Sequence, residues 1–468
     1  MKLPAYPKYK PTGVEWLGDV PEHWDVKRLD FLATVKARLG WKGLTASEYV
    51  PEGFIFLATP NIKGEGEIDF TNVNYITSER FYESPEIMVQ VGDVLMAKDG
   101  STLGTTNVVH HLPAPTTVNS SVAVLRPKPT LDSSYFFRWL TSAYLQSLIQ
   151  SMKDGQGVPH LFQADIKKFP VLLPPTAEQR AIAGFLDRET GRLDRLVAKK
   201  RELIERLKEK RTALISRTVT RGLPPVAARA AGLRESSPLK SSGLEWLGEI
   251  PEHWEAISLK HLVWIPIIDG PHETPLKQDS GIPFVSAESV AKGFIDFGKI
   301  WGYISDEDHK RYSRRYKPRR GDVLLIKLGA TTGTPAIVET DVEFNIWVPL
   351  AAIRLKSIME PRLLLHILRS RNLQDAYQLH WTFGTQQTLG LETISELRIP
   401  VPPIPEQAAI TAYLDLETAK LDALVGKVEE AVERLQEYRT ALITAAVTGK
   451  IDVRDWGSSC KKGGRHEN

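Results

Sequence analysis

The side chains in this sequence that could do chemistry are mainly basic, and residues 310–320, KRYSRRYKPRR, concentrate them. This stretch holds seven basic residues in eleven, with two tyrosines between them. Lys and Arg neutralise DNA phosphates, and Tyr can stack on a base or hydrogen-bond to a backbone. The stretch therefore predicts a local DNA-binding patch, although a solvated basic loop explains the same composition. The corresponding stretch of the first half, FYESPEIMVQV at 81–91, is not basic.

A second candidate is the glycine-rich turn that follows each of two GDVL segments. GDVLMAKDGSTLGTTNVV at 92–109 and GDVLLIKLGATTGTPAIV at 321–338 share 10 of 18 residues. The matched polar positions are Lys98 with Lys327, Thr102 with Thr331, and Thr105 with Thr334. Such a loop can bring backbone N–H groups and one cation to a phosphate. A tight turn that needs positive φ at Gly100 and Gly104 explains the glycines equally well.

Motifs for catalysis are missing. The glycine-rich turns lack the Lys-Ser/Thr of a nucleoside-phosphate loop, and no HExxH metal motif occurs. The Pro-Pro pairs at 174, 224 and 402 lack the acid before and the aromatic after that an amino-group methyltransferase carries. His23 and His253 lie in PEHW, but two matched copies flanked by Trp24 and Trp254 favour a structural corner. We expect a binding protein with no catalytic residues, no metal and no cofactor of its own.

The segments that position these residues occur twice. GVEWLGDVPEHWDVKRL at 13–29 returns at 243–259 as GLEWLGEIPEHWEAISL with 10 of 17 identities, and one unit of about 230 residues is duplicated. Short apolar runs punctuated by Gly and Pro predict strands, and one helix is expected in each globular part, at 134–152 and 362–379. The expected strands are Phe54–Ala58, Val94–Ala97, Val122–Leu125 and Val171–Leu173, with counterparts Phe284–Ser286, Val323–Lys327, Leu350–Leu355 and Leu397–Val401. The predicted fold class is α+β with a mixed or mainly antiparallel sheet.

Each unit ends in a long predicted helix with coiled-coil spacing. Residues seven apart form one row: Leu186, Leu193, Lys200, Leu207 and Leu214 in the first helix, and Leu414, Leu421, Val428, Leu435 and Leu442 in the second. The expected flanking row is Leu196 and Leu203 in the first helix, and Leu424, Ala431 and Tyr438 in the second. Residues 178–221 carry 13 Lys/Arg and 7 Asp/Glu, a net +6, whereas 406–450 carry 5 and 8, a net −3. Opposite signs favour pairing of these helices within one chain.

Length and composition bound the remaining organisation. The chain has 468 residues, 42% of them hydrophobic, and a net charge of +3, so a nucleic-acid surface must be a local patch. The single cysteine, Cys460, excludes an intrachain disulfide and fits a reducing cytoplasm. No apolar run is long enough to span a bilayer. The expected parts are a globular domain at 1–173, a helix at 174–221, a linker at 222–240, a second domain at 241–401, a helix at 402–450 and a flexible tail at 451–468.

Four duplicated motifs, WLGxxPxHW, GDVL…G…G, PP…EQ…I…(Y/F)LD and RTALI…VT, together resemble the specificity subunit of a type I restriction–modification system. The resemblance covers nearly the whole chain, in both halves and in order. It implies that each globular domain is a target-recognition domain for one half of a bipartite double-stranded DNA site. It also implies that the two helices pair antiparallel as a spacer. The subunit would dock two methyltransferase subunits, which bind S-adenosylmethionine and methylate adenine, and through them restriction subunits in the cytoplasm.

Within this resemblance we assign candidate DNA contacts by residue chemistry. Arg, Lys and Asn suit guanine or adenine edges, and Asp and Glu can accept from cytosine. The candidates are Lys36, Arg38, Lys42, Asn61, Lys63, Lys98, Thr102 and Thr105 in the first unit, and His272, Arg311, Arg314, Arg315, Lys317, Lys327 and Thr331 in the second. Because these loops differ between the units, the two half-sites should differ.

Apolar positions off the helix seam are candidates for docking the methyltransferase subunits: Ile182, Phe185, Ile410 and Tyr413. The alternative is that they bury against their own recognition domains. A specificity subunit of a methylation-only or phage-defence variant fits the same sequence. A stand-alone methyltransferase or nuclease is disfavoured by the missing motifs, and a coiled-coil scaffold without DNA leaves the duplicated domains unexplained.

Overall fold

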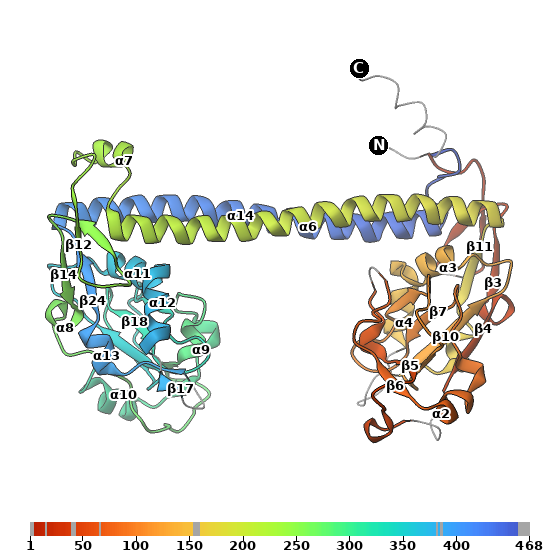
Figure 1. Ribbon diagram of the computed structural model, residues 1–468, viewed down its shortest axis with the longest axis horizontal. Helices are drawn as coiled ribbons and strands as arrows, with labels where there is room; N and C mark the ends of the chain where they lie inside the picture. Colours follow the sequence, from red (N-terminus) through yellow and green to blue (C-terminus); the bar gives the residue numbers. More distant parts are fainter. Residues whose placement is uncertain are drawn as a thin grey trace, which may run out of the picture. The chain divides into compact units, whose positions relative to one another are not determined.

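The computed structural model describes residues 4–14, 16–38, 44–64, 67–152, 160–380, 382–383 and 387–456, without the side chains of 378–383 and 387. The chain divides into two compact units. Unit 1 comprises residues 1–200 and 430–468, and unit 2 comprises residues 201–429. Each unit therefore holds one globular domain and part of each long helix (Figure 1).

Unit 1 is built from short strands and short helices. Its strands are β1 (Tyr9–Pro11), β2 (Asp19–Pro21), β3 (Asp25–Arg28), β4 (Ala33–Ala37), β5 (Phe54–Leu57), β6 (Asn74–Ile76), β7 (Val94–Ala97), β8 (Thr106–Val108), β9 (Thr116–Val118), β10 (Val122–Pro127) and β11 (Pro170–Leu173). Its helices are α1 (Leu29–Leu32), α2 (Ser78–Tyr82), α3 (Ser133–Leu140), α4 (Ala143–Ser151) and α5 (Gln163–Ile166), with short 3₁₀ turns η2 (Ala46–Glu48), η3 (Thr59–Asn61) and η4 (Pro85–Ile87).

Unit 2 repeats this set. Its strands are β12 (Leu239–Ser241), β13 (Glu249–Pro251), β14 (Glu255–Ser258), β15 (Ile268–Asp269), β16 (Ile282–Val285), β17 (Gly302–Ile304), β18 (Val323–Ile326), β19 (Pro335–Ile337), β20 (Asn345–Ile346), β21 (Leu350–Ile353), β22 (Thr382–Phe383), β23 (Gln387–Thr388) and β24 (Arg398–Val401). Its helices are α7 (Pro225–Ala230), α8 (Leu259–Leu262), α9 (Ala287–Val290), α10 (Asp306–Ser313), α11 (Pro361–Arg369), α12 (Arg371–His380) and α13 (Leu391–Glu396), with the 3₁₀ turn η5 (Phe297–Lys299).

The sheets of the two units have the same topology. A four-stranded antiparallel sheet has the order β4-β10-β7-β8 in unit 1 and β15-β21-β18-β19 in unit 2. A three-stranded sheet with one parallel pair has the order β6-β5-β9 in unit 1 and β17-β16-β20 in unit 2. The expected strands and the α+β class with mixed sheets are confirmed.

The four-stranded sheet is the central layer of each domain. In β10, Ala123 and Leu125 are buried in the core with α3 and α4, whereas Val122 and Val124 are buried in the core with the three-stranded sheet. Both faces of the strand are covered, so its sequence is an unbroken apolar run instead of an alternating one. The corresponding residues of β21 alternate between two cores in the same way.

Each expected single helix is in fact two helices. α3 and α4 replace the helix expected at 134–152, and α11 and α12 replace the one expected at 362–379. The break falls at a buried serine, because the Ser142 hydroxyl accepts a hydrogen bond from the N–H of Leu145 and caps α4. The cap of α3 is Asp132, whose carboxylate accepts from the N–H groups of Ser134 and Tyr135.

The two long helices are confirmed. α6 spans Thr176–Arg221 with 46 residues and α14 spans Ile404–Val447 with 44. They pack against each other as a coiled coil (Figure 1). Two equivalent cross-helix ion pairs, each of 2.9 Å, join Asp194 to Arg439 in unit 1 and Arg211 to Asp422 in unit 2. The pair farther along α6, at Arg211, uses the earlier residue of α14, Asp422, so the helices run antiparallel.

The first seam row is confirmed, but our flanking row is wrong by one residue. Leu196, Leu203, Leu424 and Tyr438 are 41–55% exposed. The second buried row lies one position later, at Val197 and Ile204 in α6 and at Val432 in α14. A coiled-coil seam alternates steps of three and four residues, and the step from Leu193 to this row is four. The exposed row lies beside the seam and not within it.

Two connecting segments are more ordered than expected. The segment expected as a linker at 222–240 contains α7 and the first residues of β12. The expected tail at 451–468 begins with packed residues, since Val453 is buried and Trp456 lies at 5.0 Å from Phe185. The Asp452 N–H also donates to the carbonyl of Pro4 at 2.7 Å. In the part of the chain that the structure describes, no helix has both the length and the apolar character to cross a membrane.

Candidate nucleic-acid interface

The duplicated PEHW motif anchors the long helices. In unit 1, Glu178 in the first turn of α6 accepts from Trp24 Nε1 at 2.9 Å and lies 2.8 Å from His23 Nε2. In unit 2, Glu406 in the first turn of α14 makes the same two contacts, with Trp254 at 3.0 Å and His253 at 2.8 Å. The structural interpretation of PEHW is therefore confirmed.

The aspartate of GDVL forms a buried ion pair in each unit. Asp93 receives two hydrogen bonds from Arg126, at 2.7 and 2.8 Å, and Asp322 receives two from Arg354, at 2.8 and 2.6 Å. Each arginine also donates to a backbone carbonyl of the preceding loop. The pair fixes the start of the central strand, so this motif belongs to the fold.

The turn after GDVL needs its glycines for conformation. Gly100 and Gly104 have φ of 79° and 85°, and Gly329 and Gly333 have φ of 104° and 91°. A Cβ on Gly104 would lie 3.1 Å from the side chains of Gln146 and Ile149 in α4. These features favour the tight-turn explanation over a phosphate loop. Thr102 and Thr331 remain exposed on this turn.

In unit 2 the candidate cations converge on one buried carboxylate, Asp269 at the end of β15. Lys327 Nζ lies 3.2 Å from Asp269 Oδ2 and is itself nearly buried. Arg315 contacts Oδ1 at 3.0 Å and His272 Nε2 contacts Oδ2 at 3.0 Å, with both side chains more than half exposed. Sequence reasoning predicted the three cations but not that one acid would join them.

A second acid continues this cluster. Glu273 accepts from the Tyr312 hydroxyl at 2.8 Å and pairs with Arg311 at 2.7 Å. Burial and the hydrogen bond to Glu273 raise the pKa of Tyr312 to about 12, so its hydroxyl stays protonated. Together with Asp269 and Arg315, these residues line an open cavity of about 450 Å³. The cavity is lined by both positive and negative side chains together with apolar groups such as Pro271 and Ile346.

The rest of the basic stretch is partly neutralised. Lys317 pairs with Glu343, and Arg320 pairs with Asp341 at 3.1 Å. Arg314 is exposed, and no ion pair to it is found among the described residues. Tyr312 and Tyr316 are buried at 8% and 6% exposure, so our interpretation of these tyrosines as DNA-stacking groups is wrong. They belong to the two cores of unit 2.

In unit 1 the lysine equivalent to Lys327 has a different acid. Lys98 Nζ is buried and lies 3.2 Å from Asp99 Oδ2, and the other oxygen of Asp99 pairs with His160 Nδ1. The His160 side chain is 37% exposed and meets the ring of Phe162 edge-on at 4.5 Å. Sequence reasoning missed Asp99 and His160, because they are separated by 61 residues and Asp99 is a position at which the two GDVL segments differ.

The other candidates of unit 1 do not form one cluster. Arg38 is buried at 2% exposure and donates to Ser84 Oγ and the Val118 carbonyl, so its guanidinium is used within the fold. Asn61 is also buried and holds the carbonyls of residues 69 and 72. Lys36 is exposed on β4, and Lys63 pairs with Asp69 at 2.6 Å and lowers the pKa of that carboxyl. Thr105 is half-buried in its turn, and Lys42 lies outside the described residues.

The four expected docking residues are turned inward. Ile182 and Ile410 are 0% exposed and Phe185 is 4% exposed, each within the core of its own unit. Tyr413 is half-buried against the core of unit 2. These positions follow the alternative interpretation, in which each helix start packs on its own domain. The docking assignment is therefore corrected.

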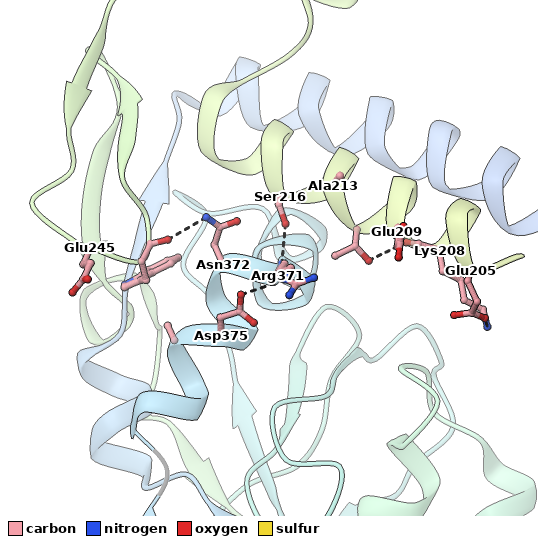
Figure 2. Close-up of a pocket in the computed structure, with 12 residues that line it drawn as sticks. Glu205, Lys208, Glu209, Ala213, Ser216, Glu245, Arg371, Asn372 and Asp375 are labelled. Atoms are coloured by element: carbon pink, nitrogen blue, oxygen red, sulfur yellow. Dashed lines mark hydrogen bonds and ion pairs between the residues drawn. The ribbon is translucent and has the colours of Figure 1, made fainter. Parts of the chain in front are cut away.

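A different surface is duplicated and open. In unit 2 a groove of about 1120 Å³ lies between α6 and the start of α12, beside Trp246 (Figure 2). The N–H of Arg371 donates to Ser216 Oγ at 2.9 Å across its end. In unit 1 a groove of about 700 Å³ lies between α14 and the start of α4, where the Ala143 N–H donates to Thr444 Oγ1 at 3.0 Å. These two grooves, here called the helix grooves, are equivalent.

The helix grooves are lined by the same sequence motifs. Thr212 and Ala213 of RTALI line the groove in unit 2, and Thr440 and Ala441 line it in unit 1. These small residues leave the long helix accessible in both units. The helix grooves share three lining positions, Glu209, Thr212 and Ala213 in unit 2 with Glu437, Thr440 and Ala441 in unit 1. Their domain sides differ, because Arg371 and Asn372 of unit 2 stand where unit 1 has Ala143 and Tyr144.

Comparison with known proteins gives one consistent family. The model of the type I restriction modification DNA specificity domain matches twice, at residues 21–206 and 251–434. The EcoKI specificity subunit of Escherichia coli K12 is 20% identical over 453 residues, covering 93% of this chain and 91% of that protein. The MjaVIII specificity subunit of Methanocaldococcus jannaschii is 24% identical over 454 residues, covering 93% and 95%.

Solved structures share the fold. A chain from a study of complex assembly and conformational transition of the type I R-M system aligns with a TM-score of 0.67 at 19% identity, covering 92% of this chain and 98% of that one. The HsdS subunit of Thermoanaerobacter tengcongensis aligns with a TM-score of 0.50 and the same identity and coverage. With the family model matched in both duplicated units, this chain belongs to the specificity subunits of type I restriction–modification systems.

Proposed function

We propose that each unit recognises one half of a bipartite DNA site and that the two half-sites differ in sequence. The observation that carries this proposal is the contrast within the duplication. The strands, the GDVL ion pair and the helix anchors are the same in both units, but the polar groups around Lys98 and Lys327 are unlike. Unlike side chains on equal frames favour different base sequences.

In unit 2 the contacts would come from the exposed cations of the cluster and its neighbours. Arg315 and Arg311 each keep part of the guanidinium free beside the cavity, and such groups suit guanine edges or phosphates. Arg314, Lys317 and Thr331 are exposed around them and could contact phosphates. In unit 1 the corresponding proposal rests on Lys36, Lys63 and Thr102, while Lys98 is paired with Asp99.

We propose that the helix grooves dock two methyltransferase subunits, one on each unit. The long-helix side of both grooves keeps the same glutamate, threonine and alanine, and such a repeated helix surface suits a partner that binds twice. The groups around Lys98 and Lys327 differ between the units, which suits DNA of two different sequences. The partner subunits would bind S-adenosylmethionine and methylate adenine, and restriction subunits would join through them. The present chain would supply no catalytic residue. Because its target is DNA, we propose a cytoplasmic location.

The exposed apolar row of the coiled coil supports a second part of this docking surface. Leu196 and Tyr438 in unit 1, and Leu203 and Leu424 in unit 2, lie at least 41% exposed beside the seam. On the opposite flank of the coil, Asp187 and Asp415 are bonded to arginines of their own domains. The apolar flank therefore stays open for helices of a partner.

The coiled coil would also set the distance between the half-sites. A deletion of seven residues from α6 and seven from α14, in register, removes two turns and about 10 Å from the coil while preserving the heptad phase. The recognised gap should shorten by about three base pairs, because DNA rises 3.4 Å per base pair. A deletion of seven residues from one helix alone is the control and should unfold the pairing. An unchanged gap would contradict the spacer role.

The function itself is tested with purified proteins. The chain alone, given labelled S-adenosylmethionine and DNA, should transfer no methyl group, whereas its complex with the partner methyltransferase should methylate adenine in specific sites. Methyl transfer by the chain alone would favour a stand-alone enzyme. Ala441→Arg should block the groove of unit 1 and leave a complex with one methyltransferase copy, as Ala213→Arg should for unit 2. Native mass spectrometry distinguishes one copy from two.

A further inference from the structure

Both units contain an ordered series of one lysine, one aspartate and one histidine, here called the Lys–Asp–His series. In unit 1 it is Lys98, Asp99 and His160, and in unit 2 it is Lys327, Asp269 and His272. Lys98 is buried and Lys327 nearly so, and the histidine is the most exposed member, with its side chain 37% exposed in unit 1 and 67% in unit 2. The aspartate joins the two.

The lysine is the same residue in both units, but the other members are not. Lys98 and Lys327 each follow the central strand of the four-stranded sheet, β7 or β18. The position of Asp99 is occupied in unit 2 by Leu328, since Asp99 pairs with His160 and Leu328 pairs with the equivalent residue, Thr388 of β23. The position of Asp269 is occupied in unit 1 by Ala37, since both face the equivalent alanine of β10 or β21. The aspartate of the series therefore comes from the turn after the central strand in unit 1 and from the edge strand β15 in unit 2.

This difference separates the series from the shared frame. The GDVL ion pair and the PEHW contacts use matched residues in both units, as expected for parts of an inherited fold. The Lys–Asp–His series keeps its chemistry while its aspartate and histidine come from different segments. The same three residue types occur at the same place although two of them come from different positions in the two units. This points to a role for the exposed member of the series, the histidine.

The physical consequence is a fixed histidine. The aspartate is held by the neighbouring ammonium, because Lys98 and Lys327 are 9% and 12% exposed and a cation at that depth is costly without its carboxylate. Asp269 is itself buried, whereas Asp99 is 23% exposed. The carboxylate can only accept, so the ring nitrogen that faces it carries a hydrogen. The other ring nitrogen, Nε2 of His160 or Nδ1 of His272, is then the free one. A neutral imidazole accepts a hydrogen bond there.

We propose that His160 and His272 each contact one base of their own half-site, and that Asp99 and Asp269 are the residues that position them. The free ring nitrogen would accept from an exocyclic amino group, adenine N6 or cytosine N4, at the edge of the major groove. In unit 2, Arg315 shares Asp269 with His272 and would contact the neighbouring base or phosphate. This assignment rests on the proposed function, because it presumes that the units recognise DNA.

The test uses the complex of the full chain with its methyltransferase and duplexes in which one half-site at a time is randomised. His160→Ala should lower discrimination at one base pair of the first half-site by about ten-fold or more, and His272→Ala should do so in the second half-site. The other half-site should be unchanged in each case. His160→Gln and His272→Gln keep an accepting oxygen and should restore part of the discrimination.

The positioning role of the aspartates is tested by base discrimination, which a loss of stability alone would not change. Asp99→Asn and Asp269→Asn should lower discrimination at the same base pair as the histidine variant of that unit, with a higher KM on the cognate site and little change in kcat. His111→Ala and His261→Ala are matched controls, since both histidines are exposed and neither contacts a buried aspartate in the described structure. They should leave every base preference unchanged.

Two outcomes overturn the assignment in different ways. If the wild-type complex prefers certain bases in both half-sites and His160→Ala and His272→Ala leave those preferences intact, the histidines do not contact bases although the proposed function stands. If the wild-type complex shows no base preference, the proposed function fails and the assignment fails with it. Thermal unfolding of His272→Ala should match the wild type, because His272 is 67% exposed and the Lys–Asp pair is kept. His160→Ala also loses the contact with Phe162, so His160→Gln is the variant whose unfolding should stay near the wild type.

Discussion

In unit 1, Lys98 pairs with the next residue along the chain, Asp99, whereas in unit 2 Lys327 pairs with Asp269 from a strand 58 residues earlier (327 − 269). The strands around these lysines have the same order and register in both units. The units therefore share their strands and differ in the polar side chains that surround the equivalent lysines. If the units recognise DNA as we propose, this contrast separates residues that serve folding from residues that serve recognition.

A second comparison concerns the ends of the domains that meet the long helices. In unit 1, Arg138 bonds Asp187 of α6 at 2.7 Å, and in unit 2 the equivalent His366 bonds Asp415 of α14 at 2.8 Å. Here the acid on the long helix is kept and the domain residue has changed. The frame thus tolerates exchanges whose consequences can be measured. Matched substitutions in both units test the first two consequences, and a substitution in unit 2 tests the third.

The largest effect is expected at the GDVL ion pair. Asp322→Ala should destabilise unit 2 by about 3–5 kcal/mol, because it leaves the Arg354 guanidinium, 17% exposed, and the Tyr316 hydroxyl without their carboxylate. Asp93→Ala should cost less in unit 1, since Arg126 is 35% exposed and can reach water. Hydrogen exchange resolved by peptide measures each unit separately. Equal losses, or a loss in the unsubstituted unit, would contradict a self-contained frame.

A smaller effect is expected where each long helix ends in a glycine. Gly449 and Gly222 have φ of 69° and 79°, so alanine at either position costs about 1 kcal/mol. A Cβ on Gly449 would also lie 2.3 Å from Pro21 Cδ, whereas on Gly222 the nearest atom is at 3.4 Å. Gly449→Ala should therefore cost about 2–4 kcal/mol in all, and Gly222→Ala about 1 kcal/mol. Chemical denaturation checks the difference, and equal values would refute the packing argument.

The smallest effect is a dependence of stability on pH in unit 2 alone. Burial lowers the pKa of His366 below its usual 6.5, against the opposing effect of Asp415. Below pH 6.5 the unfolded chain binds a proton that the folded chain does not, so stability falls as the pH drops through that value towards the folded pKa. The equivalent residue of unit 1 is Arg138, so unit 1 has no histidine at this position.

His366→Gln is the control for this prediction. It removes the titrating group, so the slope of unfolding free energy between pH 7 and pH 5 should become shallower in unit 2. The wild-type slope in unit 2 should exceed that in unit 1 by the contribution of one proton. A slope that His366→Gln leaves unchanged would show that other groups cause it.

Much of this frame follows from the sequence because its signals are local and occur twice. The apolar runs at Val94–Ala97 and Val122–Leu125 and the heptad row through Leu193 predict β7, β10 and α6. Finer features depend on tertiary contacts. The break at Ser142 and the shift of the second seam row from Leu196 to Val197 depend on which neighbours cover each residue.

The candidate site was less predictable for a related reason. Exposed basic residues such as Arg315 are visible from composition, and the structure joins them to His272 and Lys327. The acid that joins them lies in another segment, and its identity differs between units. Arg38, chosen for its chemistry, is buried instead, because a long cationic side chain can pack in a core when carbonyl and hydroxyl oxygens accept its hydrogen bonds.

The central claim is that two equal frames carry unlike recognition groups and so recognise two unlike half-sites. The most direct test is genome-wide mapping of adenine methylation in cells that express this chain with its methyltransferase. We predict a split motif, with two different short half-sites around a fixed unspecified gap and methyladenine in each. A continuous motif, or two identical half-sites, would contradict the account.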